Sequence, residues 1–226
     1  MAERWRQIAI SIGVSTVAGF FIAILRLWNA ALRKDTRQLE KLDRYAAEGH
    51  QVVAVFWHGK YLPLFPLAKG KDAIVITVNS FRGRVIGEIC KRFGYRPVLL
   101  PADTKAHGFP ALLQQVKENA KLIALALDGP KGPYHRIRAG ALKLSALHGV
   151  KLAPVGIASS RKIVMTSRWD HQEAPLPFSR VALAVGDVID LSEHVDDGGN
   201  ARLEDIVRQG MEAVEREAQD ILAAMA

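Results

Sequence analysis

Between residues 52 and 185, short apolar runs alternate with segments of helical periodicity, and this alternation limits the possible folds more than any other feature. The apolar runs, which we expect to be strands, lie at 52–57, 73–78, 96–100, 122–127, 152–158, 163–167 and 181–185. The helical patterns between and after them lie at 84–94, 109–119, 139–148 and 202–225. Strands and helices joined by tight connections predict an α/β fold with a mostly parallel sheet flanked by helices.

The N-terminal region contains an uncharged run at 7–25, which is 19 residues long. A helix of that length reaches about 28 Å, close to the thickness of the hydrocarbon core of a bilayer. Trp5 and Trp28 lie where interfacial aromatic residues are found. We therefore predict a membrane-anchoring helix, spanning or re-entrant, over 1–28 and a single α/β domain over 29–226. A buried core helix and a cleaved signal peptide are the alternatives.

The charge balance points to a polyanionic partner. The chain has 31 Lys and Arg residues against 23 Asp and Glu residues, which gives a net charge of +8. Nucleic acid, an anionic membrane surface and an acidic carrier protein would all fit this charge. Residues 26–48 predict a basic amphipathic helix that lies on anionic headgroups or packs on the domain. No aromatic-and-basic strand pattern and no helix-turn-helix indicates nucleic-acid binding, and no Cys/His cluster has metal-binding spacing.

His58 directly follows the buried-strand pattern at 52–57. Ligands of open α/β sheets bind at the carboxyl ends of the strands, and the segment 59–63, with its glycine and proline, is expected to turn the chain away there. Imidazole is the side chain best suited to accept a hydroxyl proton near neutral pH. We predict His58 as a general base, with Trp57, Gly59 and Lys60 beside the substrate. A structural histidine is the alternative interpretation.

Two further loops follow predicted strands and combine cations with glycine. The loop at 79–84 opens a helix and contains Ser80, Arg82 and Arg84, a pattern typical of anion sites. The loop at 128–136 has two prolines that fix φ and two glycines that release it, so its shape is specified rather than flexible. Its predicted site residues are Asp128, Gly129, Pro130, Lys131, Gly132, Pro133 and Arg136. A tight structural connection is the alternative.

The sequence lacks several well-known active-site motifs, including a Gly-x-Ser-x-Gly elbow, a P-loop and a Rossmann glycine pattern. It does contain an ordered set of other motifs, namely Phe56-Trp57-His58-Gly59, Asn79-Ser80-Phe81-Arg82-Gly83-Arg84, Asp128-Gly129-Pro130-Lys131-Gly132-Pro133, Ala153-Pro154-Val155-Gly156, Trp169-Asp170 and Pro175-Leu176-Pro177-Phe178-Ser179-Arg180. In this order, over about 45–190, the chain resembles the lysophospholipid acyltransferase superfamily, and within it the bacterial DUF374 branch.

The resemblance implies a glycerolipid acyltransferase-like fold and transfer of an acyl chain from an acyl thioester to a hydroxyl of a lysophospholipid or related membrane lipid. Acyl-CoA or acyl carrier protein would be the donor, with no further cofactor and no metal. It also implies a bacterial inner-membrane location, with the catalytic domain at the cytoplasmic face. In that picture Lys131 and Arg136 hold the acceptor phosphate, and Arg82 or Arg84 holds either that phosphate or the donor's. Backbone amides near Gly59 or Gly129, or the Arg82 guanidinium, stabilise the oxyanion.

The family motif also places an aspartate five residues after the histidine, and here that position is Pro63. Asp128 is our first candidate for a substitute acid, and Glu88 is the second. The remaining interpretations are an unassisted histidine and a protein without activity. The latter would be a non-catalytic lipid-binding protein of the same fold, or a membrane-tethered binder of another polyanion.

Overall fold

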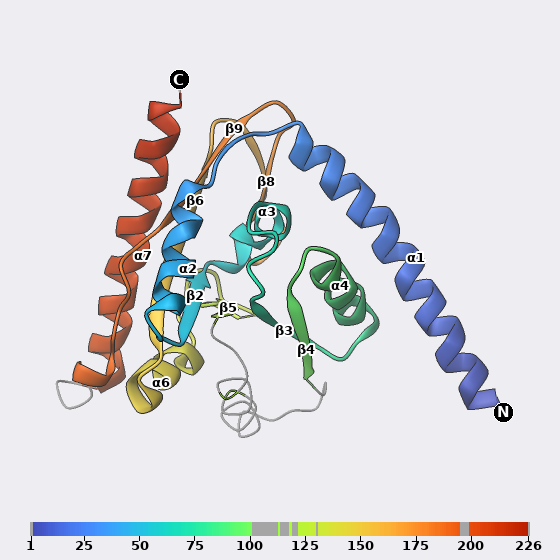
Figure 1. Cartoon of the computed structure of the whole chain (residues 1–226), viewed down its shortest axis with the longest axis horizontal. Helices are drawn as coiled ribbons and strands as arrows, with labels where there is room; N and C mark the ends of the chain where they lie inside the picture. The colour runs from blue at the N-terminus through green and yellow to red at the C-terminus, as the bar shows by residue number, and fades with distance from the viewer. Residues whose placement is uncertain are drawn as a thin grey trace.

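The structure is a computed structural model that describes residues 2–100, 113, 118, 122–129, 131–194 and 199–225. Over these residues a seven-stranded sheet has the order β1-β9-β6-β2-β5-β3-β4 (Figure 1). Its strands are β1 (Arg33–Asp35), β2 (Val52–Phe56), β3 (Ile74–Val78), β4 (Arg96–Leu100), β5 (Leu122–Ala126), β6 (Lys151–Ser159) and β9 (Arg180–Val185). A separate two-stranded hairpin is formed by β7 (Lys162–Met165) and β8 (Gln172–Pro175).

Strand direction in the sheet is mostly parallel, as predicted. The pairs from β6 to β4 are all parallel, β9 pairs with β6 antiparallel, and β1 is parallel to β9. Strands β2 and β5 are adjacent, with Phe56 opposite Ala126. Because these two strands run in the same direction, the residues that follow them meet at one edge of the sheet.

Helices cover both faces of the sheet. They are α1 (Ala2–Ala30), α2 (Glu40–Ala47), α3 (Tyr61–Leu67), α4 (Phe81–Arg92), α6 (Ala139–His148) and α7 (Gly199–Ala224). The alternating side chains of β2 show the two layers. Val52 and Ala54 pack in a cluster with residues of α1 to α4, whereas Val53 and Val55 pack in a second cluster with residues of α6 and α7.

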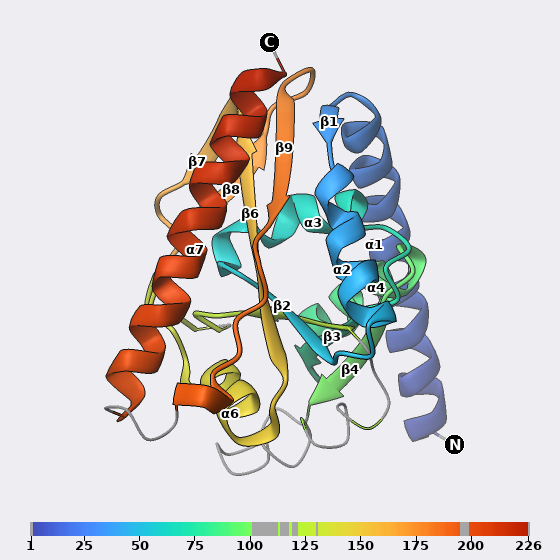
Figure 2. The same cartoon turned by 60° about the vertical axis from the view of Figure 1, so that its left-hand side comes forward.

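The long C-terminal helix α7 packs along β6 and β9 (Figure 2). A Cβ atom at Gly156 would lie 2.4 Å from the backbone oxygen of Val214, so glycine permits this close approach of helix to sheet. The amphipathic pattern at 202–225 is thus confirmed as a helix that packs on the sheet, and it begins three residues earlier, at Gly199.

At the other end of the chain, α1 runs along the flank of the domain beside α4 (Figure 1). Its segment Ile10–Ala30 is 21 residues long with a mean hydropathy of 2.0, which is long and apolar enough to cross a membrane. The helix extends to Ala30 rather than to residue 28.

Two local predictions differ from the structure, and a third falls mostly on residues that it does not describe. Residues 26–48 form the end of α1, the short edge strand β1, a 3₁₀ turn and α2 instead of one helix, because β1 pairs with β9 at the sheet edge and this pairing outweighs helix propensity. The segment 59–63 is not a turn away from the sheet but a 3₁₀ turn followed by the start of α3. The helix predicted at 109–119 falls almost entirely outside the described residues.

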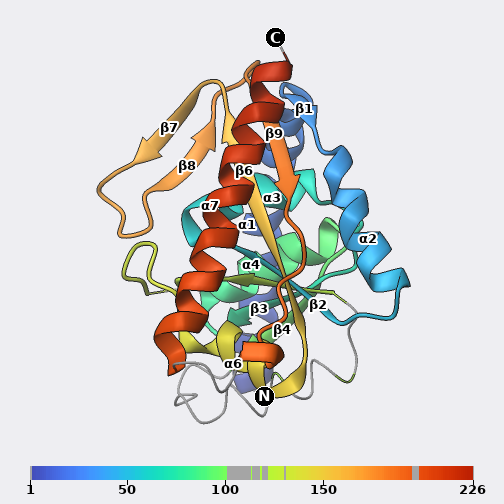
Figure 3. The ribbon, with the colours of Figure 1, turned by 90° about the vertical axis from the view of Figure 1, so that its left-hand side faces the viewer.

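The run at 163–167 was predicted as a strand of the sheet, and the structure places it elsewhere. Residues Lys162–Met165 form β7, which pairs antiparallel with β8, and the resulting hairpin projects from the body beside α7 (Figure 3). The hairpin turn, 166–171, contains the Trp169-Asp170 pair, so its position decides where those two side chains lie.

Candidate active site

His58 lies at the carboxyl edge of the sheet, where the sequence places it. The chain leaves β2 at Phe56, stays extended at Trp57 and then enters a 3₁₀ turn at His58–Lys60. The turn is closed by a hydrogen bond from the Lys60 backbone N–H to the Trp57 carbonyl oxygen, with a donor–acceptor distance of 2.8 Å. The His58 side chain is about 20% exposed, so it remains accessible from solvent.

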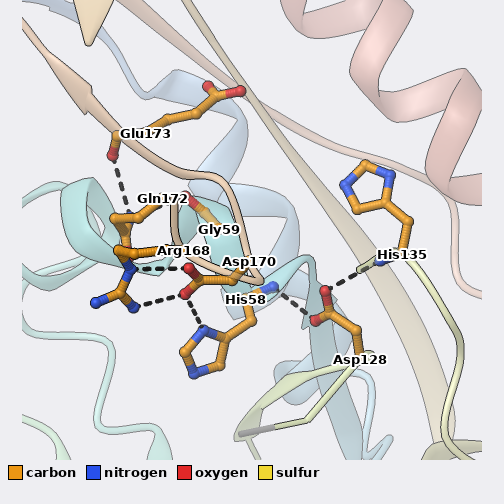
Figure 4. Close-up of polar contacts among 8 residues, drawn as sticks. All are labelled: His58, Gly59, Asp128, His135, Arg168, Asp170, Gln172 and Glu173. Carbon is orange, nitrogen blue, oxygen red and sulfur yellow. Dashed lines mark hydrogen bonds and ion pairs between the residues drawn. The ribbon is translucent and has the colours of Figure 1, made fainter. Parts of the chain in front are cut away.

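An aspartate contacts the imidazole of His58. Asp170 Oδ2 lies 2.7 Å from His58 Nδ1, and the Asp170 side chain is completely buried (Figure 4). The acid comes from the β7–β8 turn, 112 residues further along the chain. Since Nδ1 is engaged, Nε2 is the ring nitrogen left for a substrate, and the described residues provide no hydrogen bond to it.

Arg168 fixes the Asp170 carboxylate from its other side. Arg168 Nε donates to Oδ1 and Nη2 donates to Oδ2, both at 2.8 Å, in a two-pronged arrangement. Burial alone would raise the pKa of Asp170, but the hydrogen bonds from Arg168 and His58 and the charge of Arg168 outweigh it and lower the pKa to about 2. Asp170 is therefore ionised at neutral pH, and it holds His58 in the tautomer that carries its proton on Nδ1.

Asp128, the first candidate for the acid, binds the backbone of His58 instead of its ring. Asp128 Oδ1 accepts a hydrogen bond of 2.8 Å from the His58 backbone N–H, and Oδ2 accepts one of 3.4 Å from the His135 backbone N–H (Figure 4). The side chain is fully buried, and burial raises the pKa of Asp128 against the opposing effect of these amides. Asp128 thus joins the turn after β2 to the loop after β5, and the acid at the imidazole is Asp170.

Glu88, the second candidate, is remote from His58. It lies on α4 and pairs with Lys91 and Arg92 on the same helix, at nitrogen–oxygen distances of 3.7 and 3.4 Å. These i,i+3 and i,i+4 pairs are ordinary surface contacts of a helix.

The hairpin is held against the His58 turn by a close backbone contact. A Cβ atom at Gly59 would lie 2.2 Å from the Asp170 carbonyl oxygen, so only glycine allows the approach. Gln172 Nε2 also donates a 2.8 Å hydrogen bond to the Gly59 carbonyl oxygen. The role of Gly59 that the structure shows is therefore to admit the acid-bearing turn.

The loop at 128–136 also packs against this turn. A Cβ atom at Gly132 would lie 2.4 Å from the Trp169 ring, and the Trp169 ring in turn lies 5.1 Å from the His58 ring, centroid to centroid. Lys131, Pro133 and Arg136 are exposed on the same loop. Pro130 lies outside the described residues. Gly129 has a φ of +66°, and its backbone N–H already donates to the Ala126 carbonyl oxygen at 3.2 Å.

Trp57 and Lys60 were predicted to contact substrate, but in the structure both side chains make contacts within the protein. Trp57 is 3% exposed and its ring stacks on that of His135 at 4.2 Å. Burial, together with the charges of Lys60 and Arg208, lowers the pKa of His135 to about 4 and keeps this stack neutral. Lys60 Nζ pairs with Glu173 Oε1 at 2.8 Å and is largely enclosed, so it ties the His58 turn to β8.

The loop at 79–84 forms the N-terminus of α4, two strands away from β2. Ser80 is its N-cap, since its hydroxyl oxygen accepts a 3.1 Å hydrogen bond from the Gly83 backbone N–H. Arg84 Nε donates to Asn79 Oδ1 at 2.9 Å, and Arg82 is exposed. With about 4.8 Å between strands, this cationic helix end is about 10 Å along the edge from β2, on the same side of the sheet. Ser80, Arg82 and Arg84 are therefore separated from His58 along this edge.

Two surface cavities in the described part of the chain lie away from His58. The larger, of about 570 Å³, lies between the α2 region and the end of α7; its lining includes Arg37, Lys41, Arg44 and Ile221. The smaller, of about 270 Å³, lies between α1 and α4.

Sequence reasoning located His58 and both flanking loops but did not identify Asp170 and Arg168 as partners of the histidine. Trp169-Asp170 stood out in a cation-bearing loop after the strand predicted at 152–158 and in the family pattern, without a role in either. The Arg-x-Asp spacing in a connection between two strands is the one local signal in the sequence, and it does not reveal which strand end the turn reaches.

Comparison with known proteins yields one informative relative and no family assignment. No family model matches the chain. Over 140 residues the chain is 25% identical to Uncharacterized protein RP090 of Rickettsia prowazekii (strain Madrid E). The match covers 60% of this chain and 62% of that protein, so the chain spans less than two thirds of its length. What the chain is similar to is thus a bacterial protein whose name assigns it no activity.

Proposed function

We propose that the chain is a membrane-associated acyltransferase that moves an acyl group from acyl-CoA or acyl carrier protein to a hydroxyl of a lysophospholipid or related membrane lipid. The observation that carries the proposal is the 2.7 Å contact between His58 Nδ1 and the buried carboxylate of Asp170. A histidine oriented by an ionised acid, at the carboxyl edge of a parallel sheet, is the arrangement that general-base catalysis needs. It supplies the acid that is missing from position 63.

In the proposed reaction, Nε2 of His58 takes the proton from the acceptor hydroxyl as the oxygen attacks the thioester carbonyl carbon. Asp170 stabilises the imidazolium that forms. The tetrahedral intermediate collapses, the carbon–sulfur bond breaks, and the leaving sulfur takes the proton from Nε2, so that free thiol and neutral histidine are restored. No acyl-enzyme is needed, because the thioester is already activated. Backbone amides near Gly59, or the Arg82 guanidinium, would stabilise the oxyanion, an interaction worth about 3 kcal/mol per donor.

Two groups of cationic side chains at the same edge of the sheet support the binding of a substrate that carries a phosphate. Lys131 and Arg136 are exposed on the loop beside Trp169, and the N-terminus of α4 presents Arg82 and Arg84. We assign the first pair to the acceptor phosphate. The second group, about 10 Å along the edge, is suited to that phosphate or to the phosphate of the donor.

The apolar helix α1 and the net charge of +8 support the proposal that the protein functions at an anionic membrane. We place the protein at the bacterial inner membrane with the catalytic domain at the cytoplasmic face, where acyl thioesters are made. The alternative is a non-catalytic lipid-binding protein. It does not explain why a buried aspartate, held by an arginine, contacts the imidazole of His58.

The proposal is tested with the full chain in phospholipid vesicles. Labelled acyl-CoA and acyl carrier protein are offered with a panel of lysolipids, and the acylated product is measured. Replacing His58 by Ala is expected to lower turnover by about 10²- to 10⁴-fold. The control His50→Ala alters a histidine that lies before β2 and pairs only loosely with Glu48, and it should change little. Turnover that survives in His58→Ala would remove the base assignment, and no turnover with any donor in the unmodified protein would favour the lipid-binding alternative.

A further inference from the structure

The two long sides of α1 differ. On one side Val14, Ala18, Ile22 and Leu25, spaced by four, four and three residues, are buried against the domain. On the opposite side Ile12 is 62%, Phe20 67% and Leu27 74% exposed. A stripe at this spacing is the docking face of an amphipathic helix, but here the outer face is apolar too.

The inner face of α1 is firmly attached. Its buried residues share one hydrophobic cluster with Phe65 of α3 and with Val85 and Ile89 of α4. Near its end, Trp28 Nε1 donates a 2.7 Å hydrogen bond to the Pro175 carbonyl oxygen, which fixes the helix to the end of β8. The attachment runs from Ile10, which is partly buried against this cluster, to Trp28.

This attachment leaves too little helix to cross a bilayer. Helix α4, alongside the attached part, exposes Arg82, Lys91 and Arg92 and belongs in water or among headgroups. Only residues 2–9 extend beyond the contact, and eight residues at about 1.5 Å each reach about 12 Å, well short of about 30 Å of hydrocarbon. To span, α1 would have to leave its cluster and expose the apolar faces of α3 and α4.

The outer face suits lipid better than a protein partner. The segment 7–25 carries no charge, and the hydroxyl of Thr16 on that face donates at 3.0 Å to the Ile12 carbonyl oxygen of its own helix, so it needs no water. Trp5 is 67% exposed at one end of the run. Around the helix, Arg26, Arg33, Lys91 and Arg92 are exposed, and Lys34 Nζ donates at 2.8 Å to the Asn29 carbonyl oxygen at its C-terminus. These cations would be attracted to anionic headgroups. A second copy of this chain, which also carries a net charge of +8, would be repelled.

We propose that α1 is a monotopic anchor, which keeps one face docked on its own domain and immerses the other in the acyl chains of a single leaflet. The N-terminus and the catalytic domain then lie on the same side of the membrane. The proposal specifies the membrane association in the proposed function, but it does not depend on acyl transfer. Either the monotopic anchor or the acyltransferase activity could therefore be disproved without the other. The anchor also sets the depth of the proposed active site relative to the membrane. The reason is that α1 packs directly on α4, and the N-terminus of α4 carries Arg82 and Arg84.

Topology is tested by labelling single cysteines with a membrane-impermeant maleimide in spheroplasts and in inverted membrane vesicles. One variant carries Glu3→Cys, near the N-terminus, and the other Lys143→Cys, exposed on α6; the native Cys90 is fully buried and serves as the unlabelled background. We expect both positions to react in the same preparation and to be protected in the other. Labelling of the two positions on opposite sides would establish a spanning helix and overturn the proposal.

Lipid binding by the outer face is tested by sedimentation with vesicles of phosphatidylglycerol and phosphatidylethanolamine. The double variant Ile12→Asp with Phe20→Asp should lower the partition coefficient by at least about tenfold, because two apolar side chains no longer enter the acyl region. The matched control is Leu147→Asp, which alters a leucine of similar exposure, 64%, on α6, and it should bind as the unmodified protein does. Equal binding of the double variant overturns the proposal. So does light scattering in detergent that shows a dimer for the unmodified protein and a monomer for the double variant.

Discussion

The turn after β5 and the turn of the β7–β8 hairpin each bring a buried aspartate to His58, and the two aspartates contact different atoms. Asp128 accepts a hydrogen bond from the backbone nitrogen, and Asp170 accepts one from the ring. Their pKa values shift in opposite directions, since burial dominates at Asp128 while Arg168 and His58 outweigh burial at Asp170. The proximity of a carboxylate to a histidine, in the sequence or in a sheet, therefore does not reveal the role of the carboxylate. The atom that it reaches decides between positioning the chain and orienting the imidazole.

The sharpest test of the difference is Asp170→Asn. The variant keeps the shape of the side chain but removes the charge that fixes the tautomer of His58 and stabilises the imidazolium, so we expect turnover to fall about 10³-fold. The measurement is turnover in vesicles, with circular dichroism to show that the fold persists. Asp187→Asn, at an exposed position before the isolated bridge to β6, is the matched control. If Asp170→Asn retained a third of the activity, the dyad would have no catalytic role.

Gly59→Ala tests the contact that brings the hairpin turn to His58. The new methyl group would lie 2.2 Å from the Asp170 carbonyl oxygen, and a backbone atom cannot yield as a flexible side chain does. We expect the free energy of unfolding to fall by about 2 to 3 kcal/mol, and turnover to fall with it. The control Gly186→Ala places its methyl group 3.5 Å from Pro154, an ordinary contact, and should be near neutral in denaturant titration. Equal stability of the two variants would mean that the hairpin is not docked as described.

Acid titration should separate the two aspartates through stability. The pKa of Asp170 is lowered to about 2 in the folded protein, against about 3.9 in an unfolded chain, so the folded state binds fewer protons in this window. Its contribution of about 2 kcal/mol is present above about pH 4 and is lost as the pH falls towards 2. In urea titrations between pH 5 and pH 2.5, Asp170→Asn should therefore lose less stability than the unmodified protein. Asp128, with its raised pKa, contributes with the opposite sign, so Asp128→Asn should steepen the loss.

The smallest expected effect is that of Asp128→Asn on turnover. An asparagine Oδ1 can still accept the hydrogen bond from the His58 backbone N–H, so the turn keeps its shape and turnover should stay within about threefold of the unmodified value. Initial rates measured beside those of Asp170→Asn give the comparison directly. A loss as large as that of Asp170→Asn would assign Asp128 a part in the chemistry.

The parts of this molecule that the sequence predicts are those determined by local patterns. The buried run of β2 and its parallel neighbours predicted the sheet, and the end of β2 predicted the location of His58, because strand burial and strand direction follow from short-range periodicity. Asp128 was predicted only as a candidate acid, and the pairing of Phe56 with Ala126 on adjacent strands brings it to the His58 backbone N–H instead of the ring.

The parts that the sequence missed depend on contacts between distant segments. Arg33–Asp35 reads as helix by composition but joins β9, and the 163–167 run reads as a sheet strand but forms a hairpin. Trp57 was predicted to meet substrate, yet its ring packs on His135 across the loop after β5. Asp170 is the strongest case, because no rule of spacing connects a turn residue to a histidine 112 positions earlier.

The distance along the chain between His58 and Asp170 also has a kinetic consequence. Closing a loop of that length costs conformational entropy before native contacts offset the cost, so we expect the hairpin to dock after the local helices and the central strands have formed. On refolding from denaturant, the far-ultraviolet signal should return ahead of catalytic turnover, and the lag between them times the arrival of the acid. The His58–Asp170 contact would thus report that a long-range contact of the fold has formed.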